Sequence, residues 1–303
     1  MIAFWRILKQ AAIDFINDHG IKFSAALSYY TIFSMGPILI IIISLTGIFF
    51  GREAVQGKVY EQINQVVGNS AALQIQNIIQ NIEQSQLSTS GAVVGIVILL
   101  VGATGIFTEI QDSINFIWSI KAKPKKGFIK LLINRLISFS LIISVGFLLL
   151  VSLIINAMVE LLHDRLLKIF DDASVYIFHA INYGILLTVI TILFAIIFRV
   201  LPDATIRWKD ALLGALFTAV LFLIGKFLIG FYLSWSSIGV TYGAAASIVL
   251  ILIWVYYTSI IVYFGAEFTK VYALRHGSGI EPNDTAVFII KQESKEFVYN
   301  ETD

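Results

Sequence analysis

The sequence has no cysteine, only four prolines among its 303 residues, and few charged side chains. The absence of cysteine excludes disulfide bonds, thiolate nucleophiles and cysteine-ligated metal sites. Basic and acidic side chains nearly balance, at 21 and 20, which excludes a strongly basic surface for nucleic acid. Apolar sequence is what the chain has in abundance. Hydrophobic residues make up 58% of it and charged residues 14%, a composition typical of membrane proteins.

Long apolar runs predict an all-α, polytopic membrane protein with six transmembrane helices. Between Ala211 and Leu233 the only charged residue is Lys226, and a helix of that length rises about 34 Å, enough to cross a bilayer. Pro37 lies inside the first span and predicts a kink there. The predicted spans cover residues 24–50, 91–118, 131–162, 175–201, 211–233 and 244–272, in one membrane domain of residues 1–273.

The N-terminal segment 2–18 is amphipathic and predicts a helix. Such a helix would lie in the membrane interface, or it would pack on the cytosolic ends of the bundle, since a headgroup layer and a protein surface accept the same apolar stripe. The stripe comprises Phe4, Trp5, Leu8, Ala11, Ala12, Phe15 and Ile16.

Two further segments lie outside the predicted spans. Residues 51–90 are rich in Gln and Asn, and we expect an extramembrane helical hairpin there. Residues 274–303 are polar and predict a mobile tail, although the apolar residues 287–290 could dock on the rest of the protein. Lysine and arginine concentrate in the N-terminal segment, in the loops after the second and fourth spans, and in the tail. This bias predicts that both termini are cytosolic.

Ionisable and polar side chains within the spans are the candidates for function, because burying them in a bilayer is costly. One set lies in the cytosolic third of the oriented spans and predicts a vestibule for a head group or ions. Its arginines would contact anions, and its carboxylates would hold cations or protons. The structural alternative is that these residues only cap and link helix ends. The set comprises Tyr29, Tyr30, Glu109, Asp112, Asn115, Arg135, Arg199 and Glu267.

Lys226 lies nearer the outer side of the membrane, about 12 Å from the outer end of its span at helical rise. It therefore does not share a depth with Glu109 or Glu267. Its expected neighbours are Asn156 and Asn182, which form an outer polar layer with it. Because a lysine at that depth needs a partner or water, a role in a substrate pathway is favoured for Lys226.

No enzymatic, metal or cofactor site is predicted. Gly225 and Lys226 resemble the end of a phosphate-binding loop, but Val220 and Phe227 stand where that loop needs a glycine and a hydroxyl residue. The four histidines are far apart in the predicted topology, which argues against a histidine metal site. Topology also brings no Ser, His and Asp together as a catalytic set. We therefore expect a protein that is not an enzyme.

Three ordered motifs resemble the YihY/BrkB family of bacterial inner-membrane proteins. They are AALSYYTIFSMGPILI at residues 25–40, GATGIFTEIQDSINFIW at residues 102–118, and a pair of segments, LPDATIRWKDALLGA and TYGAAASIVLILIWVYYTSIIVYFGAEFTKVYA, between residues 201 and 273. The resemblance implies a six-span protein of the bacterial cytoplasmic membrane with both termini inside. Members carry an old ribonuclease BN label regarded as misassigned, and the family is associated with serum resistance and with the handling of envelope lipid.

Three functions are compatible with these patterns. The preferred hypothesis is a transporter or flippase for a lipid or an amphipathic envelope molecule, with membrane lipids as its partners. The alternative is a scaffold that does not transport and binds envelope proteins through residues 51–90. A ribonuclease or another membrane enzyme is the third, which the missing nucleic-acid surface disfavours. The sequence fixes no oligomeric state.

Overall fold

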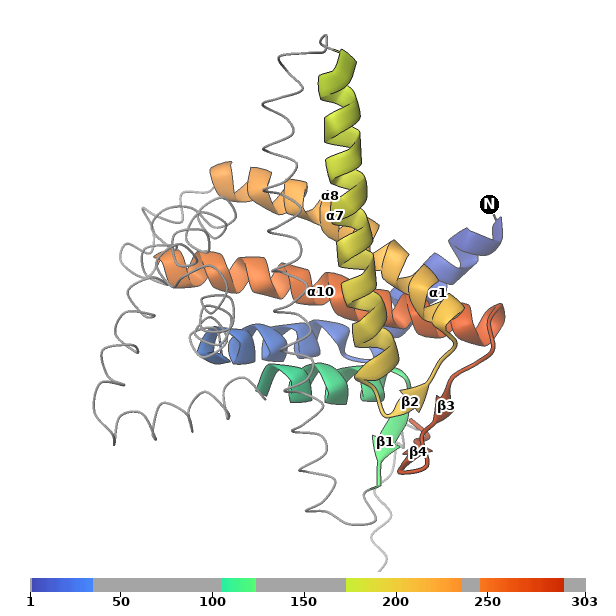
Figure 1. The fold of residues 1–303 in the computed structure, drawn as a ribbon. Coiled ribbons are helices and arrows are strands. Elements are labelled where there is room, and N and C mark those ends of the chain that lie inside the picture. Colours follow the sequence, from blue (N-terminus) through green and yellow to red (C-terminus); the bar gives the residue numbers. More distant parts are fainter. Residues whose placement is uncertain (1, 35–104, 124–172, 236–245, 292–303) are drawn as a thin grey trace, which may run out of the picture.

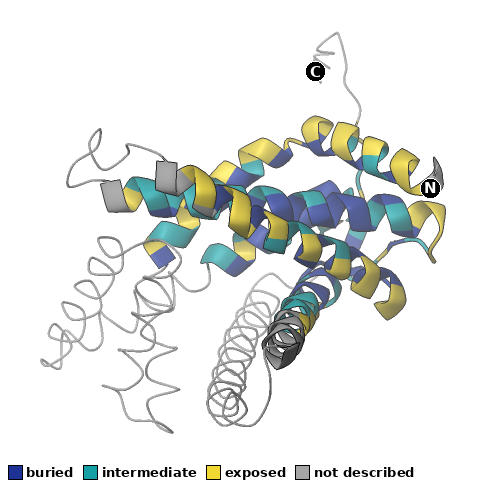
Figure 2. Ribbon diagram, turned by 90° about the horizontal axis from the view of Figure 1, so that it is seen from above, coloured by how far each residue is buried: buried dark blue, intermediate teal, exposed yellow. Residues whose placement is uncertain are grey.

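The structure is a computed structural model that describes residues 2–34, 105–123, 173–235 and 246–291 (Figure 1). Long helices dominate these ranges: α1 (Ile2–Asn17), α7 (Ala173–Val200), α8 (Trp208–Trp235) and α10 (Ala246–Arg275), with further helical segments at 20–34 and 105–117. The strands are short: β1 (Ile120–Ala122), β2 (Ala204–Thr205), β3 (Glu281–Pro282) and β4 (Ala286–Phe288). Buried residues gather where the helices meet, and exposed residues lie on the outer sides (Figure 2).

Two of the helices are long and apolar enough to cross a membrane. They run from Trp208 to Ile229 and from Ile248 to Arg275, and they agree with the predicted spans at 211–233 and 244–272. A shorter apolar helix covers Leu186–Val200, inside the predicted span at 175–201. The helical segments 20–34 and 105–117 lie inside the predicted first and second spans. The predicted span at 131–162, the hairpin at 51–90 and Pro37 lie outside the described residues, so the structure leaves the six-span count a prediction.

Close packing between α8 and α10 depends on two reciprocal pairs of glycine and threonine. A Cβ atom added at Gly214 would overlap the side chain of Thr269, and one added at Gly265 would overlap the side chain of Thr218. Each threonine hydroxyl donates to the carbonyl of the glycine four residues earlier in its own helix, at 2.7 Å in α8 and 2.6 Å in α10. Glycines of this kind let helix backbones approach closely in membranes, where burial of apolar surface does not drive association.

The segments 20–34 and 105–117 run antiparallel. Phe116, near the end of one segment, packs on Phe23 near the start of the other, with ring centroids 5.3 Å apart. Gly105, at the opposite end, faces Tyr30 and Ser34. Opposite directions are what consecutive spans require. In contrast, α7 runs across α10 in Figure 1, and it packs mainly on α8. The sequence predicts a fourth span at 175–201, and the crossing of α7 over α10 leaves that span a prediction.

Helix α1 packs on α10, as the second of the two sequence interpretations predicted. Its buried side chains are Ile7, Ala11 and Phe15, and the first two contact Phe268 and Val271 of α10. The buried side of α1 therefore includes Ile7, which the predicted apolar stripe does not, and it is turned around the helix axis relative to that stripe. After Asn17 the chain reverses at His19, which has a left-handed backbone conformation with φ of 58°.

The chain after α10 is built into the fold up to residue 291, which differs from the mobile tail expected at 274–303. Strand β4 pairs antiparallel with β1, and β3 pairs antiparallel with β2. Between α10 and β3, Asp210 of α8 accepts hydrogen bonds from the backbone N–H and the hydroxyl of Ser278, both at 3.1 Å. The sequence left open that the apolar residues 287–290 dock on the rest of the protein, and the pairing of β4 with β1 is such a docking. Residues 292–303 lie outside the described residues.

Candidate functional site

The segment 105–117 brings acidic side chains to a place where three helical segments meet. Ser113 donates a hydrogen bond to the carboxylate of Glu109 at 3.2 Å, one helical turn away. Tyr263 of α10 is fully buried, and its ring packs on Phe23 at a centroid distance of 6.4 Å. Its hydroxyl lies against Ser113, within electrostatic range of Glu109 and Asp112, but has no aligned hydrogen bond within the described ranges. We call Glu109, Asp112, Ser113 and Tyr263 the acidic site.

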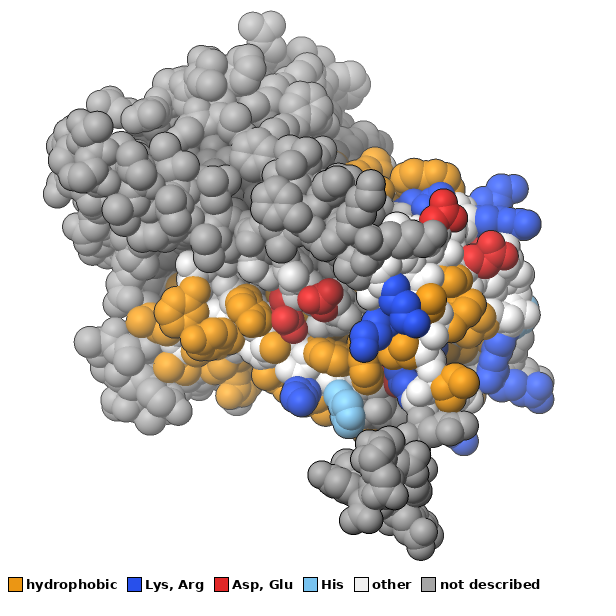
Figure 3. All heavy atoms as spheres, turned by 90° about the horizontal axis from the view of Figure 1, so that it is seen from below, with side chains coloured by type: hydrophobic (Ala, Val, Ile, Leu, Met, Phe, Trp, Pro, Cys, Tyr) orange, Lys and Arg blue, Asp and Glu red, His pale blue; other side chains and the backbone are white. Residues whose placement is uncertain are grey.

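Negative charge in the acidic site is not balanced by a described basic side chain. Glu109 and Asp112 repel each other, and Asp112 is also repelled by Asp203. Neither Glu109 nor Asp112 has an ion pair with any residue that the structure describes. Acidic side chains are visible between apolar ones on the face shown in Figure 3. Carboxylates in such a setting attract a proton or a cationic group.

An exposed aromatic surface lies on the neighbouring segment 20–34. Tyr29 and Phe33 are 60% and 66% exposed, and their ring centroids are 4.7 Å apart. Tyr30 is also exposed and faces Gly105 of the adjacent segment. Glu109 follows Gly105 by one turn, so it is on the same side of its helix. The structure therefore places Tyr30 beside the segment that carries Glu109, whereas the ring contacts of Tyr29 are with Tyr30 and Phe33 of its own segment.

Asn115 makes a structural pair. Its side-chain Oδ1 accepts from the backbone N–H of Asp203 at 2.8 Å, and its Nδ2 donates to the Asp203 carboxylate at 2.9 Å. Gln111 donates to the same carboxylate at 3.2 Å. These bonds fix the turn before β2 on the segment 105–117. Asn115 is buried, and the arrangement supports the structural alternative for this one member of the predicted set.

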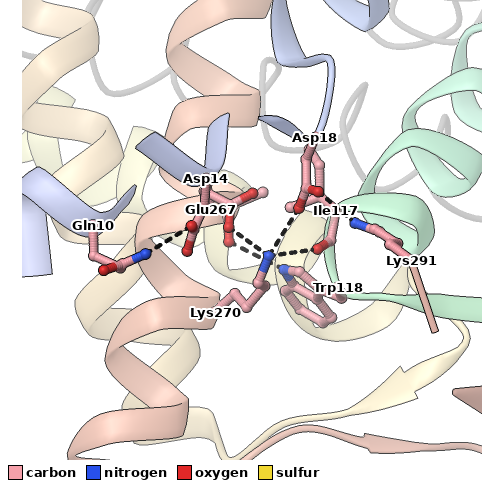
Figure 4. A network of polar contacts seen from close by, with 9 residues as sticks. Gln10, Asp14, Asp18, Ile117, Trp118, Glu267, Lys270 and Lys291 are labelled. Atoms are coloured by element: carbon pink, nitrogen blue, oxygen red, sulfur yellow. Dashed lines mark hydrogen bonds and ion pairs between the residues drawn. The ribbon is translucent and has the colours of Figure 1, made fainter. Parts of the chain in front are cut away.

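Glu267 lies in a different cluster, which joins α10 to the turn after α1 (Figure 4). The Nζ of Lys270 is 2.6 Å from Glu267 Oε1 and 2.9 Å from Asp18 Oδ2. It also donates to the carbonyl of Ile117 at 2.8 Å. Lys291 places its Nζ 2.7 Å from Asp18 Oδ1. We call Asp18, Glu267, Lys270 and Lys291 the ion-pair cluster.

The ion-pair cluster contains two carboxylates and two ammonium groups, so its charges compensate one another. Burial lowers the pKa of the Lys291 ammonium, and the hydrogen bond that this ammonium donates to Asp18 acts in the opposite direction. The ammonium also lies 4.3 Å from the ring centroid of Phe116, a cation–π contact. Sequence reasoning missed Asp18, Lys270 and Lys291. The spacing of Lys270, three residues after Glu267 on one helix, was a usable signal, whereas the other two depend on contacts distant in the chain.

The remaining predicted residues are dispersed. Arg199 places its guanidinium 5.8 Å from the ring centroid of Trp208, at the junction of α7 and α8. Lys226 is exposed on α8 between the exposed residues Ile224 and Phe227, and it makes no polar contact with the rest of the described chain. Asn182 lies in α7, but its side chain is not among those described. Arg135 and Asn156 lie outside the described residues, which contain no group of three or more metal-binding side chains.

Comparisons with known proteins match nearly the whole chain. The model of the family described as "Virulence factor BrkB" matches residues 12–287. Relatives named UPF0761 membrane protein occur in Azotobacter vinelandii, with 30% identity over 87% of this chain and 62% of the relative, and in Saccharophagus degradans, with 26% identity over 86% and 58%. A third, from Aliivibrio fischeri, is 28% identical over 84% of this chain and 79% of its own length.

Against the first two relatives, the chain spans about three fifths of their length. These names state a membrane protein and mention no enzymatic activity. No solved structure matches the chain. The resemblance that the three sequence motifs indicated is confirmed.

Proposed function

The chain belongs to the BrkB family of integral membrane proteins, and from this premise we propose that it transports a lipid or another amphipathic envelope molecule. The observation that carries the proposal is the acidic site. There, Glu109 and Asp112 lie without a described basic partner beside the fully buried Tyr263.

The chemistry of this arrangement suits a molecule with one polar and one apolar end. Unbalanced carboxylates in membrane helices are expensive and are usually kept where a proton, an ion or a head group uses them. Here Glu109 is half-buried and Asp112 is exposed. The exposed rings of Tyr29 and Phe33 offer an apolar surface on the adjacent segment 20–34. In the proposed mechanism Glu109 and Asp112 hold a proton or a cationic head group, and Arg135 and Arg199 contact anionic groups.

The proposed location is the bacterial inner membrane, with both termini in the cytosol. The lysines at positions 121 and 123 support this orientation through the positive-inside rule. Because the chain has no cysteine, single-cysteine variants test it directly. A membrane-impermeant maleimide added to intact cells should label Ser85→Cys and leave Lys123→Cys unlabelled. Labelling of Lys123→Cys from outside would show that the orientation is the opposite of the predicted one.

Reconstitution into liposomes tests transport. Fluorescent phospholipids of several head groups would be placed in the inner leaflet, with and without a proton gradient, and their exchange measured by dithionite quenching. We expect the wild type to exceed empty liposomes and Glu109→Gln to lose most of the excess. Glu281→Gln, which removes an exposed carboxylate in β3, is the matched control. Exchange at the empty-liposome rate for every lipid would remove the support for a flippase.

The other candidate functions gain nothing specific from the described residues. The scaffold hypothesis depends on residues 51–90, which lie outside them. A membrane enzyme would need a set of catalytic side chains, and the acidic site in the described part of the chain offers two hydroxyls, of Ser113 and Tyr263, and two carboxylates.

A further inference from the structure

Helix α1 has an apolar flank that the protein leaves uncovered. Its inner flank is buried on α10 through Ile7, Ala11 and Phe15. The opposite flank carries Trp5 and Ile16, which are 67% and 65% exposed. These two side chains are eleven residues apart, three helical turns, and therefore lie on one side of the helix. Ala12, also exposed, lies between them on the same side and makes the strip continuous, and a continuous exposed apolar strip is typical of a surface that contacts a membrane or another protein.

The uncovered flank continues the outer surface of a membrane-crossing helix. Phe4 of α1 packs edge-on against Phe217 of α8, with ring centroids 6.3 Å apart. Leu216, which precedes Phe217 in α8, and Leu213, one helical turn before Phe217, are both exposed. Because α8 is a candidate membrane span, its exposed leucines face lipid. The apolar side chains of α1 thus begin where the lipid-facing surface of α8 ends.

The charges exposed on α1 are all positive. Arg6 and Lys9 are exposed, whereas the acidic side chain of α1, Asp14, is half-buried and accepts a hydrogen bond from Gln10 at 2.8 Å. A helix that joins an apolar flank with tryptophan to exposed basic residues matches the pattern of helices that lie in the membrane interface. Exposed basic groups at that level are attracted to anionic lipid head groups.

We propose that the outer flank of α1 docks into the headgroup layer of a membrane containing anionic phospholipid. Trp5, Ala12 and Ile16 enter the boundary of the acyl chains, while Arg6 and Lys9 lie at the level of the phosphates. The docking surface is independent of the acidic site and of any transport activity. In this arrangement α1 contacts α10 with its inner flank and lipid with its outer flank.

Single-cysteine labelling of the full-length protein tests the proposal. Ile16→Cys and its neighbour Asn17→Cys, on a different side of the helix, would each carry a bimane label in nanodiscs of phosphatidylcholine and phosphatidylglycerol. We expect lipids with a doxyl group near the carbonyl to quench the label at position 16, and iodide to quench it several-fold less than at position 17. Equal iodide quenching at both positions would overturn the proposal. Protection from iodide without doxyl quenching would also overturn it, because a protein would then cover the flank.

The role of charge has its own test. Arg6→Gln combined with Lys9→Gln should reduce doxyl quenching at position 16 in the anionic nanodiscs to the level found in pure phosphatidylcholine. If quenching is the same in both lipid compositions before these changes, the preference for anionic lipid is wrong. Ala12→Cys replaces Ile16→Cys if the latter lowers the yield of monodisperse protein. Lys121→Gln, a basic residue of β1, controls for a general loss of positive charge.

Discussion

Asp18 and Lys270 form an ion pair of 2.9 Å between the turn after α1 and the last third of α10. Both side chains are almost fully buried, and each has a second charged partner: Lys291 for Asp18, and Glu267 for Lys270. The pair therefore ties the beginning of the chain to α10 and to the strand region at its end. Integrity of this end of the bundle should depend on it.

Replacement of Asp18 by asparagine should destabilise the protein. The substitution leaves Lys270 and Lys291 with one carboxylate fewer, and removing one partner of a buried charged hydrogen bond costs about 1–3 kcal/mol. Thermal unfolding in detergent, followed by tryptophan fluorescence, measures the change. Asp14→Asn is the control, since the Asp14 carboxylate accepts from Gln10 and an amide oxygen can do the same. A similar fall in melting temperature in both variants would show that the ion-pair cluster contributes no more to stability than the Gln10–Asp14 hydrogen bond.

Gly265→Ala should loosen the packing of α8 on α10. Its Cβ would overlap the side chain of Thr218, and such overpacking costs about 1–3 kcal/mol. Adding Thr218→Ala removes the obstructing atoms, so the double variant should recover part of the loss. Gly184→Ala in α7 is the control, because no atom lies within 4 Å of an added Cβ there. Failure of the second substitution to rescue the first would contradict the reciprocal packing.

Asn115→Asp should be more damaging than its size suggests. It replaces the amide donor opposite Asp203 with a carboxylate, so two buried acceptors face each other where a 2.9 Å bond now exists. Leaving buried polar groups unpaired costs about 1–3 kcal/mol and more when they are charged. Exchange of the two residues, Asn115→Asp with Asp203→Asn, restores one donor and should restore the melting temperature. An unchanged melting temperature in the Asn115→Asp variant would mean that Asn115 and Asp203 are exposed to solvent.

A disulfide should form between β1 and β4 in the variant Lys121→Cys, Val287→Cys. These residues are directly opposite each other in the antiparallel pair, where side chains are close enough to be bridged. Mild oxidation followed by non-reducing electrophoresis after cleavage between the two sites measures the bond. Lys121→Cys with Ile290→Cys should remain reduced. Equal cross-linking of both pairs would mean that residues 286–288 do not hold a fixed register.

The sequence by itself determined that this protein lies in a lipid bilayer and where its most apolar spans lie. Apolar runs with one charge in more than twenty residues are sufficient for that, because about twenty predominantly apolar residues in a helix cross the hydrocarbon core of a bilayer. Accordingly the predicted spans at 211–233 and 244–272 agree with the apolar helices of the structure. The motifs of three segments also determined the family.

Tertiary structure decided which face of each helix meets another helix and which charges pair. In lipid, both the packed and the outer sides of a span are apolar, so hydrophobic periodicity does not separate them. Instead, the contact of α8 with α10 is placed by small residues such as Gly214 and Gly265. Strands of two or three residues, such as β2 and β4, have no pattern of their own and exist through pairing with distant segments. Glu267 looked like a lone carboxylate in the sequence, although Lys270 of the same helix pairs with it, and only the fold brings Asp18, from the turn after α1, to that lysine.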